Sequence, residues 1–524
     1  MKASMKKASA VILSLALVLP MTTTVSDAKG SIKLNKKTVT LYEGSSFKLN
    51  VKNAPATAKT IYKSNNTSVA VVTKKGNIKA KKEGTALISV TVKAQKKQQY
   101  KPIKKLSCRV NVMRGVIGPS PEPTYVPDVD PKFTGDKDAE ISDDFITQTM
   151  DFSVGLFRAS AAEAIAQGEN VMISPYSVLT DMMMATNGAG TTNLAELSNV
   201  MCGKVGFEAF RKNLSDLSAK LIYSDRVKFH IANSIWIRDD ADRIQVKQEF
   251  LDSCKEWYNA ESFVLPFDAA MADQVNAWVN LHTFGMIPVL MQDPPPEDDV
   301  MHLINALAFD GAWAQPYEKF QIAEDQDFTN AKGEKEKATM LCDTIGSYKY
   351  DDQAVGFVRY YNGGDYALLT ILPNKDVGVE KYLKDFNGAK YKAFYNSWSS
   401  GLYDVHTKLP KFSYDYTTEL NNPLKEMGIR EAFSEGADFK GMADTKSGAL
   451  YIGKVTHKTH IELDENGTKA AAVTDIGMSD ATSVDPALKK EINIFLDRPF
   501  IYAIVHTDTG IPVFIGVVNS TKSE

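Results

Sequence analysis

Short apolar runs that alternate with polar residues fill the first part of the chain, over residues 31–112. The runs TVTLY at 38–42 and ALISVTV at 86–92 place every second side chain on one face. Gly44, Gly76 and Gly84 fall between such runs, where tight turns favour glycine. A period of two interrupted by glycine turns is typical of short antiparallel strands. This part of the sequence predicts a small all-β sandwich.

The pattern changes near residue 142 to a mixture of helical and strand periods. Phe145, Phe152, Leu156 and Ala159 fall on one face of a helix, and helical spacing resumes over 178–186. Later apolar runs predict strands at 228–237, 302–309, 366–372, 403–409, 450–463, 492–496 and 513–518. Helices first and strands later indicate one large α+β domain over residues 142–524.

Two further segments carry neither pattern. Residues 1–28 begin with Lys2, Lys6 and Lys7, continue with an apolar run and end in small residues, which is typical of a secretory signal peptide. That run is shorter than the roughly 18 residues that a membrane span needs, and no later segment reaches this length. Residues 115–141 are rich in proline and acidic residues, which predicts an extended linker. We therefore expect a secreted, extracellular protein.

Charge separates these parts further. The net charge of -3 combines +2 over residues 1–28, +19 over residues 29–114, where Glu43 and Glu83 are the only acids, and -24 over residues 115–524. Lysines on the outer faces of a sandwich would attract an anionic cell-wall polymer or polysaccharide, or would simply keep edge strands from pairing. The lysines have no interleaved aromatic residues for base stacking, which disfavours nucleic acid as a partner.

The sequence offers little catalytic or metal-binding chemistry. Cys108, Cys202, Cys254 and Cys342 have no metal-ligand spacing and favour buried thiols, although one disulfide bridge is left open. No Gly-x-Ser-x-Gly motif supplies a nucleophile. A spacing of three on a strand would point His457 and His460 to opposite faces. We expect no enzyme activity, no metal and no cofactor.

Three motifs in the basic part carry a family resemblance. They are KSNNTSVAVV at 63–72, GNIKA at 76–80 and EGTA at 83–86. Together they resemble the group 2 bacterial immunoglobulin-like domain, although Tyr62 stands where that family usually has tryptophan. The resemblance implies that residues 29–114 form an immunoglobulin-like sandwich.

Residues 142–524 carry six separated motifs of a second family. They are NVMISPYS at 170–177, NALAFDGAW at 305–313, LPKF at 409–412, GIREAFSEGADF at 428–439, RPF at 498–500 and FIG at 514–516. This region resembles the serpin family over roughly its whole length. The resemblance implies the serpin fold, in which helices and three β-sheets carry an exposed reactive-centre loop. It also implies irreversible inhibition of a target serine protease, which attacks the loop and is trapped as an acyl-enzyme when the loop enters the central sheet.

The segment ENGTKAAAVT at 465–474 is similar to the hinge of inhibitory serpins. If this segment enters a sheet as a strand, one face consists of small or apolar uncharged residues and the opposite face carries the charges. The inward face begins with Thr468, Ala470, Ala472 and Thr474. The resemblance assigns the hinge to Glu465, Gly467, Thr468, Ala470, Ala471, Ala472 and Thr474, with Gly467 as its pivot.

The resemblance also implies two supporting clusters and a reactive bond. The shutter, a buried polar cluster where the sheet parts, comprises Ser174, Ser177, Asn305 and His457. The breach, where insertion starts, comprises Trp313, Lys411 and Glu465, with the last two as an ion pair.

The usual spacing of the family places the reactive bond between Ala481 and Thr482, which suits an elastase-like or subtilisin-like protease. A register one residue shorter, with Asp480 before the cut, stays open as an alternative. Met478 would suit an elastase chemically, but it lies too close to the hinge for full insertion. A non-inhibitory serpin-fold binding or scaffold protein at the cell surface is the other hypothesis. The identity of the protease and the ligand of the basic region stay open.

Overall fold

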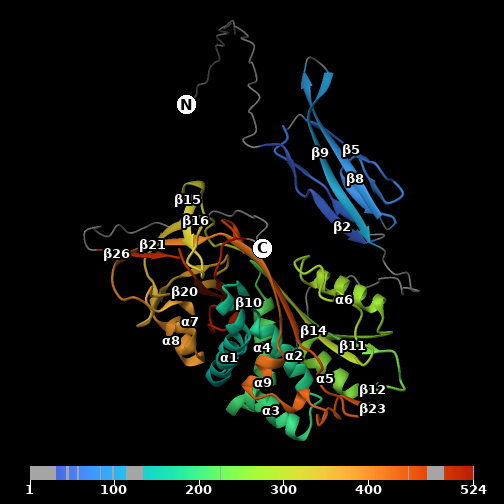
Figure 1. Ribbon diagram of the computed structural model, residues 1–524, viewed down its shortest axis with the longest axis vertical. Helices are drawn as coiled ribbons and strands as arrows, with labels where there is room; N and C mark the ends of the chain where they lie inside the picture. Colours follow the sequence, from blue (N-terminus) through green and yellow to red (C-terminus); the bar gives the residue numbers. More distant parts are fainter. Residues whose placement is uncertain are drawn as a thin grey trace, which may run out of the picture. The chain divides into compact units, whose positions relative to one another are not determined.

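The computed structural model describes residues 31–42, 46–55, 58–82, 84–96, 99–113, 134–224, 226–446, 448–468 and 489–522. Several predictions lie outside these residues, namely the signal peptide, most of the linker, the hinge residues Ala470, Ala471, Ala472 and Thr474, and the reactive bond Ala481–Thr482. The chain divides into two compact units, Met1–Ser120 and Pro121–Glu524, and each is described by itself (Figure 1).

The described part of the first unit is built from strands. These are β1 (Lys33–Leu34), β2 (Thr38–Tyr42), β3 (Ser46–Lys48), β4 (Val51–Lys52), β5 (Lys59–Ser64), β6 (Ala70–Val72), β7 (Asn77–Ala80), β8 (Gly84–Lys96) and β9 (Gln99–Met113). One sheet has the order β2-β9-β8-β5 and another the order β3-β7-β6. The predicted all-β sandwich is confirmed.

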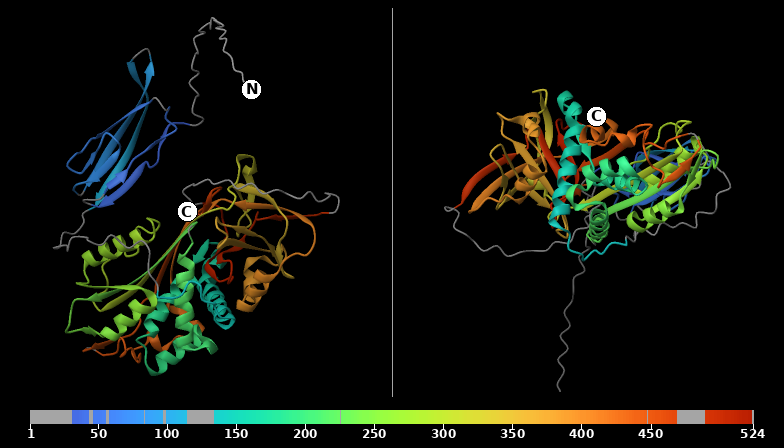
Figure 2. Two further views of the ribbon diagram at one scale, coloured as in Figure 1. Left: turned by 180° about the vertical axis from the view of Figure 1, so that it is seen from behind. Right: turned by 90° about the horizontal axis from the view of Figure 1, so that it is seen from below.

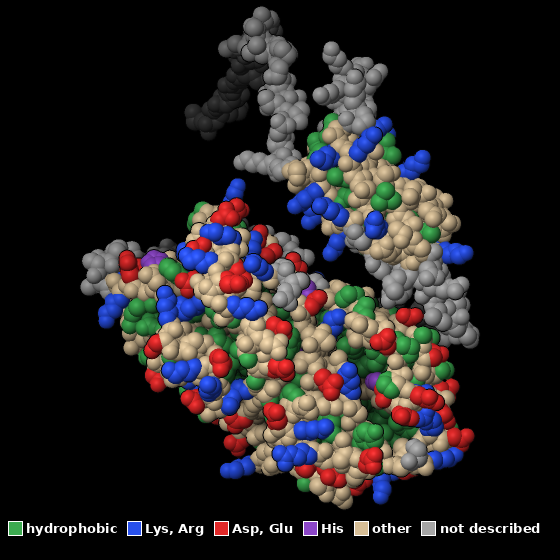
Figure 3. Space-filling view, viewed as in Figure 1, with side chains coloured by type: hydrophobic (Ala, Val, Ile, Leu, Met, Phe, Trp, Pro, Cys, Tyr) green, Lys and Arg blue, Asp and Glu red, His purple; other side chains and the backbone are tan. Residues whose placement is uncertain are grey.

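Alternation along the strands produces the core of this unit. In β7, Ile78 and Ala80 are buried while Asn77 and Lys79 are exposed. Gly76, with φ of 84°, turns the chain before β7, and a Cβ atom there would collide with the backbone of Leu49 and the ring of Tyr62. No carboxylate occurs among the described residues of this unit, and Figure 3 shows lysine and arginine side chains without acidic ones on its visible face.

The second unit contains helices with clear end signals. They are α1 (Asp143–Gln167), α2 (Pro175–Thr186), α3 (Thr191–Met201), α4 (Phe207–Ile222), α5 (Gln248–Tyr258), α6 (Ala269–His282), α7 (Gly378–Lys384), α8 (Gly388–Asn396) and α9 (Asn421–Met427). The Ser142 side chain caps α1 by accepting a hydrogen bond from the Phe145 N–H at 3.3 Å. Gly168 ends this helix in the left-handed conformation. The Ser174 side chain caps α2 in the same way as Ser142 caps α1.

Six strands form the central sheet. Their order is β13 (Ala260–Leu265), β11 (Val227–Arg238), β14 (Met301–Ala312), β25 (Gly467–Thr468), β24 (Thr456–Leu463) and β22 (Phe412–Glu419). Helix α6 packs on β11 and β14, and Figures 1 and 2 show it lying across the sheet there. Strand β25 comprises the last two described residues before segment 469–488.

Two further sheets complete the α+β unit. The seven-stranded sheet comprises β10 (Val171–Ile173), β28 (Pro512–Val518), β27 (Phe500–His506), β20 (Tyr366–Pro373), β18 (Ala354–Gly356) and β17 (Lys349–Tyr350), with β19 (Val358–Tyr360) on β20. The four-stranded sheet comprises β15 (Ile322–Thr329), β16 (Lys335–Ile345), β21 (Tyr403–Pro410) and β26 (Lys490–Phe495). A separate pair joins β12 (Ile244–Val246) to β23 (Ala443–Thr445). The predicted fold class is confirmed.

One predicted strand is wrong over its first part, residues 450–455. The apolar run at 450–463 forms a strand only from Thr456. Before that point the side chain of Asn421 donates to Gly453 O at 2.7 Å and accepts from Val455 N at 2.8 Å. Because the Asn421 side chain forms these backbone hydrogen bonds, a neighbouring strand does not form them.

The four cysteines are unpaired, three of them buried and Cys342 half-buried.

Candidate functional site

The short strand β25 lies between β14 and β24 and pairs with both. Thr468 lies opposite Gly311 of β14 and Leu463 of β24. Its side chain is 3% exposed, and its Oγ1 atom lies 2.6 Å from the Tyr361 hydroxyl. Gly467, the predicted pivot, is buried and has φ of 156°, which L side chains rarely adopt. Thr468 therefore faces the core, as its place in the predicted inward set requires.

A tight turn delivers the chain from β24 into β25. The Asp464 carboxylate accepts hydrogen bonds from Asn466 N at 2.7 Å and Gly467 N at 3.3 Å. The Asp464 backbone N–H donates to Gly467 O at 2.9 Å. These three bonds fix the direction in which the hinge enters the sheet.

Trp313, the residue directly after β14, anchors this turn. Its side chain is 1% exposed, and its indole Nε1 donates to Asp464 O at 2.9 Å. Its backbone N–H donates to Asn466 O, also at 2.9 Å. The Tyr361 ring stacks on the indole with ring centres 4.5 Å apart and planes 15° apart. Trp313 thus holds both the turn and the residue that contacts Thr468.

Lys411 and Glu465 form an ion pair beside this turn. Burial is the largest single influence on Glu465 and raises the pKa of its carboxyl. The hydrogen bond and positive charge of Lys411, together with a backbone hydrogen bond at Glu465, outweigh burial and hold this pKa below its usual value. The structure therefore brings together the three residues predicted for the breach. Because both charged side chains remain about one-third exposed, the pair is screened by water.

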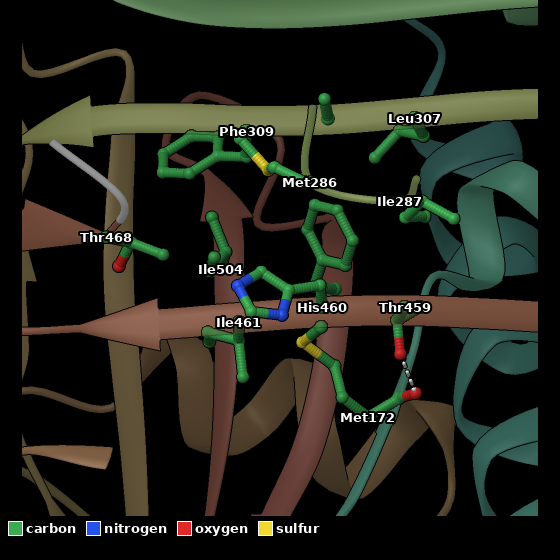
Figure 4. A pocket seen from close by; sticks show the side chains of 12 residues that line it. Met172, Met286, Ile287, Leu307, Phe309, Thr459, His460, Ile461, Thr468 and Ile504 are labelled. Atoms are coloured by element: carbon green, nitrogen blue, oxygen red, sulfur yellow. Dashed lines mark hydrogen bonds between the residues drawn. The ribbon is translucent and has the colours of Figure 1, made fainter. Parts of the chain in front are cut away.

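Beyond Thr468 a narrow hollow continues between β14 and β24 (Figure 4). Leu307 and Phe309 line it from β14, and Thr459 and Ile461 line it from β24. Met172, Ile504, Met286 and Ile287 are among the other lining residues. The cavity is about 20 Å³, which is room for a single water molecule. Among the described residues, no backbone pairing joins β14 directly to β24.

The four residues predicted for the shutter also lie together, further along the same gap. The His457 ring on β24 accepts a hydrogen bond at its Nε2 from Ser174 N at 2.9 Å. Ser174 Oγ accepts from Ser177 N at 3.2 Å, and Ser177 Oγ donates to Asn305 Oδ1 on β14. The start of α2, through the Ser174 backbone N–H and the Ser177 side chain, therefore connects the two strands that β25 separates at the other end.

Burial controls the protonation of this cluster. It lowers the pKa of His457 to about 4, so that the ring is neutral at pH 7, as an acceptor must be. Asp181, one turn along α2 from Ser177, is half-buried as a residue, and its Oδ1 atom is fully buried. Burial raises the pKa of this carboxyl to about 8, although the backbone of Asn305 opposes the shift. A neutral acid therefore lies beside the shutter at pH 7.

Reasoning from the sequence missed several members of both clusters. Asn233 on β11 extends the shutter, since it accepts from Asn305 Nδ2 at 2.7 Å and donates to Tyr258 O at 2.6 Å. Tyr361 and Asp464 belong to the breach for the reasons given above. An amide inside the apolar run 227–238 was the one available signal for Asn233.

Within the described residues, no group of three or more histidine, cysteine or acidic side chains has the arrangement of a metal site. None of the described helices is long and apolar enough to cross a membrane.

Two family models match this chain. The model of the serpins, described as serine protease inhibitors, matches residues 147–521. The model of the group 2 bacterial Ig-like domain matches residues 30–102. Each match falls within one of the two regions that carry the corresponding motifs.

Individual proteins extend this result. An uncharacterized serpin-like protein of Methanosarcina mazei is 28% identical over 70% of this chain and 85% of its own length. The leukocyte elastase inhibitor of Bos taurus is 27% identical over 67% of this chain and 93% of its own length.

Solved structures agree with the fold. The native state of the thermophilic serpin tengpin is 35% identical, with a TM-score of 0.66 over 73% of this chain and 95% of its own. Human thyroxine-binding globulin, at 23% identity and a TM-score of 0.61 over 72% of this chain and 98% of its own, shares the fold. The chain belongs to the serpin family and carries a group 2 bacterial immunoglobulin-like domain ahead of its serpin domain.

Proposed function

We propose that this protein is a secreted inhibitor that traps serine proteases by inserting its cleaved reactive-centre loop into the central sheet. The observation that carries the proposal is the position of β25. The first two residues of the inserting segment already pair with β14 and β24, and the gap beyond them is unpaired among the described residues. A strand that grows from β25 would satisfy backbone groups on both edges.

The register of β25 predicts the partners of the residues that follow. If the strand continues without a bulge, Ala470 comes opposite Phe309 and Ile461, and Ala472 comes opposite Leu307 and Thr459. Small side chains suit a hollow that is already lined by large apolar ones. Thr474 then arrives between Asn305 and His457, where a hydroxyl group can replace hydrogen bonds of the shutter.

Loop insertion would inhibit the protease by displacing it while it is still bound to the loop. The protease serine attacks the loop and forms an acyl-enzyme with its new end. About fourteen residues at about 3.3 Å each would carry this end roughly 46 Å along the sheet. The inhibitor contributes no catalytic group, because trapping depends on insertion being faster than hydrolysis of the acyl bond.

The test is to mix the full chain with pancreatic elastase, neutrophil elastase and subtilisin. We expect a complex that survives boiling in denaturant, together with a released C-terminal peptide that begins at Thr482. Mass spectrometry of that peptide also distinguishes the alternative bonds near Asp480 and Met478. Cleavage without a complex, and without a gain in heat stability of the cleaved form, would exclude loop insertion.

A pair of variants isolates the insertion step. Thr468→Arg places a charge where the side chain is 3% exposed, so the loop should be cleaved without forming a complex. Glu462→Arg, at an exposed position of β24, is the matched control and should inhibit like the wild type. A full yield of complex from the Thr468→Arg variant would contradict the proposed route.

The alternative is a non-inhibitory binding or scaffold protein with the same fold. Thyroxine-binding globulin, which has been solved in complex with thyroxine, is a serpin-fold protein of that kind. The small, uncharged residues of the hinge favour inhibition instead.

We further propose that the Ig-like domain, with its net charge of +19, holds the protein on an anionic cell-wall polymer or polysaccharide outside the cell. Sedimentation with isolated cell walls at rising salt tests this contact.

A further inference from the structure

A second hollow, of about 700 Å³, lies in the serpin domain and shares no lining residue with the β14–β24 gap. It is formed where five parts of the chain meet, one of them Asn519 just after β28, and the other four contribute most of its lining. These are the end of α1, the turn between β15 and β16, the link from β20 into α7, and the segment between β26 and β27. Hollows of this size bind small molecules in many proteins.

The hollow is positively charged. Its lining includes five cationic side chains, those of Lys332, Lys375, Lys381, Lys384 and Arg498. Glu380 is the one acidic residue in the same lining. This balance is opposite to that of residues 115–524 as a whole, whose net charge is -24. Like charges around a hollow repel one another unless an anion lies between them.

Most of these cations have no protein partner. Among the described residues, no hydrogen bond or ion pair engages the ammonium groups of Lys332, Lys375 and Lys381. Lys384 lies 4.0 Å from Glu380, and both side chains are more than 70% exposed. Water screens such a pair almost completely.

Arg498 is held in place, unlike the lysines. Its Nη1 lies 3.1 Å from Asp497 Oδ1, and its Nη2 donates to Pro373 O at 2.9 Å. Its side chain is 23% exposed, so the guanidinium group is partly covered and has a fixed orientation. A fixed planar guanidinium donor beside exposed lysine ammonium groups suits the binding of phosphate.

The need to offset helix dipoles explains the positions of only some of the five cationic residues. Lys332 lies close to Gly168 at the carboxyl end of α1, and Lys381 and Lys384 lie in the last turn of α7, where cations offset the helix dipole. Lys375 and Arg498 lie at no such helix end. A helix end also needs no hollow beside it.

We propose that this hollow binds a compact anion with two or more phosphate groups, with triphosphate as the model compound. Several phosphates are needed because the cations come from different segments of the chain and surround the space. The lysines would supply charge from the rim, and Arg498 would supply oriented donors from one wall. This binding does not depend on the proposed inhibitory function.

The test is calorimetric titration of the full chain with triphosphate at low salt. The double variant Lys375→Glu/Lys381→Glu should weaken binding at least tenfold. Lys255 and Lys440 are exposed lysines outside the hollow, so Lys255→Glu/Lys440→Glu is a control with the same change of charge. Triphosphate bound by the basic Ig-like domain would appear equally in all three proteins.

Two outcomes would overturn the proposal. One is unchanged affinity in the Lys375→Glu/Lys381→Glu variant. The other is an equal loss in the control variant, which would mean that only the overall charge matters. The Lys375→Gln/Lys381→Gln variant keeps the test informative if the glutamates prevent folding. Protease inhibition should be the same in every variant, so failure of this site is distinguishable from failure of the inhibitory mechanism.

Discussion

The two ends of the gap between β14 and β24 are closed in different ways. At the breach, the backbone of β25 pairs with both strands and an aromatic stack supports the turn that leads into it. At the shutter, the described residues connect the strands only through Ser174 and Ser177 at the start of α2, which bond to the side chains of His457 and Asn305. A growing strand can extend the first closure, but it must break the second.

If the loop inserts as proposed, this difference indicates where insertion is resisted. Adding residues to β25 exchanges water for ladder hydrogen bonds and places alanine against an apolar hollow. Passing the shutter requires that the bonds of Asn305 and His457 be exchanged for others within a buried site. Damage to the breach should therefore weaken the fold most, whereas damage to the shutter should chiefly release the sheet.

The largest effect should come from Trp313→Ala. This change removes a nearly fully buried indole, its stack on Tyr361 and its hydrogen bond to Asp464. We expect a loss of about 3–5 kcal/mol in the stability of the native form, measured by urea unfolding. Trp398→Ala, at a residue that is 47% exposed, is the control and should cost far less. Equal losses of stability in the two variants would mean that the breach does not contribute specially to the stability of the fold.

His457→Ala should cost about 1–3 kcal/mol, because it leaves the buried N–H of Ser174 without an acceptor. The freed strands should also convert faster to an inserted form on mild heating, measured as loss of inhibitory activity. His457→Gln supplies another acceptor and should restore much of the loss. If the alanine variant converted at the wild-type rate, the shutter would not be the point of resistance.

Mild acid should loosen the shutter by a smaller amount. The pKa of His457 is about 4 in the folded protein and about 6.5 when the chain is unfolded, so the unfolded state binds protons more strongly below pH 6.5. Stability from this residue is complete above pH 6.5 and is lost as the pH falls toward 4. From pH 7 to 5.5 the loss is about 1 kcal/mol.

Comparing the wild type with His457→Gln isolates the part of the pH-dependent loss of stability that is due to His457. Asp181 has the opposite sign, because its raised pKa makes the folded state bind protons more strongly below about pH 8. Its contribution is the same in both proteins and cancels in the difference. Urea midpoints at the two pH values provide the measurement, and identical pH dependence in both proteins would contradict the assignment to His457.

The smallest effect should come from Lys411→Met. Lys411 and Glu465 are both about one-third exposed, so their ion pair should contribute only about 0.5 kcal/mol. The loss should fall further in 0.5 M salt, because screening already weakens the wild-type pair. A loss above about 2 kcal/mol would mean that the pair, and not Trp313, holds the breach.

Much of the fold and of the two clusters could be predicted, because their signals lie in short stretches of sequence. The strand period predicted the sandwich, and the motifs predicted seven residues that the structure gathers into two clusters. The alternation after Gly467 correctly placed Thr468 toward the core. These features depend on local spacing or on residue types that few other functions combine.

The rest depends on contacts between distant segments. Asn233 joins the shutter because β11 pairs with β14 in a register that places it opposite Asn305. Tyr361 reaches Thr468 from a segment more than 100 residues earlier in the chain. Asn421 shortens β24 by forming hydrogen bonds with Gly453 and Val455, the backbone just before the strand. The spacing of apolar residues in the sequence cannot reveal these bonds. Such partners are fixed by tertiary packing, and the local sequence does not encode them.

The formed β25 also bears on how long each molecule stays useful. A strand that already exists needs no new nucleus, so a cleaved loop could begin to insert at once. The same start is available to an uncleaved loop, and any molecule that inserts without meeting a protease is spent. If the protein inhibits as proposed, its working lifetime would then depend less on its overall melting temperature than on how long a few buried groups around His457 hold two strands in place.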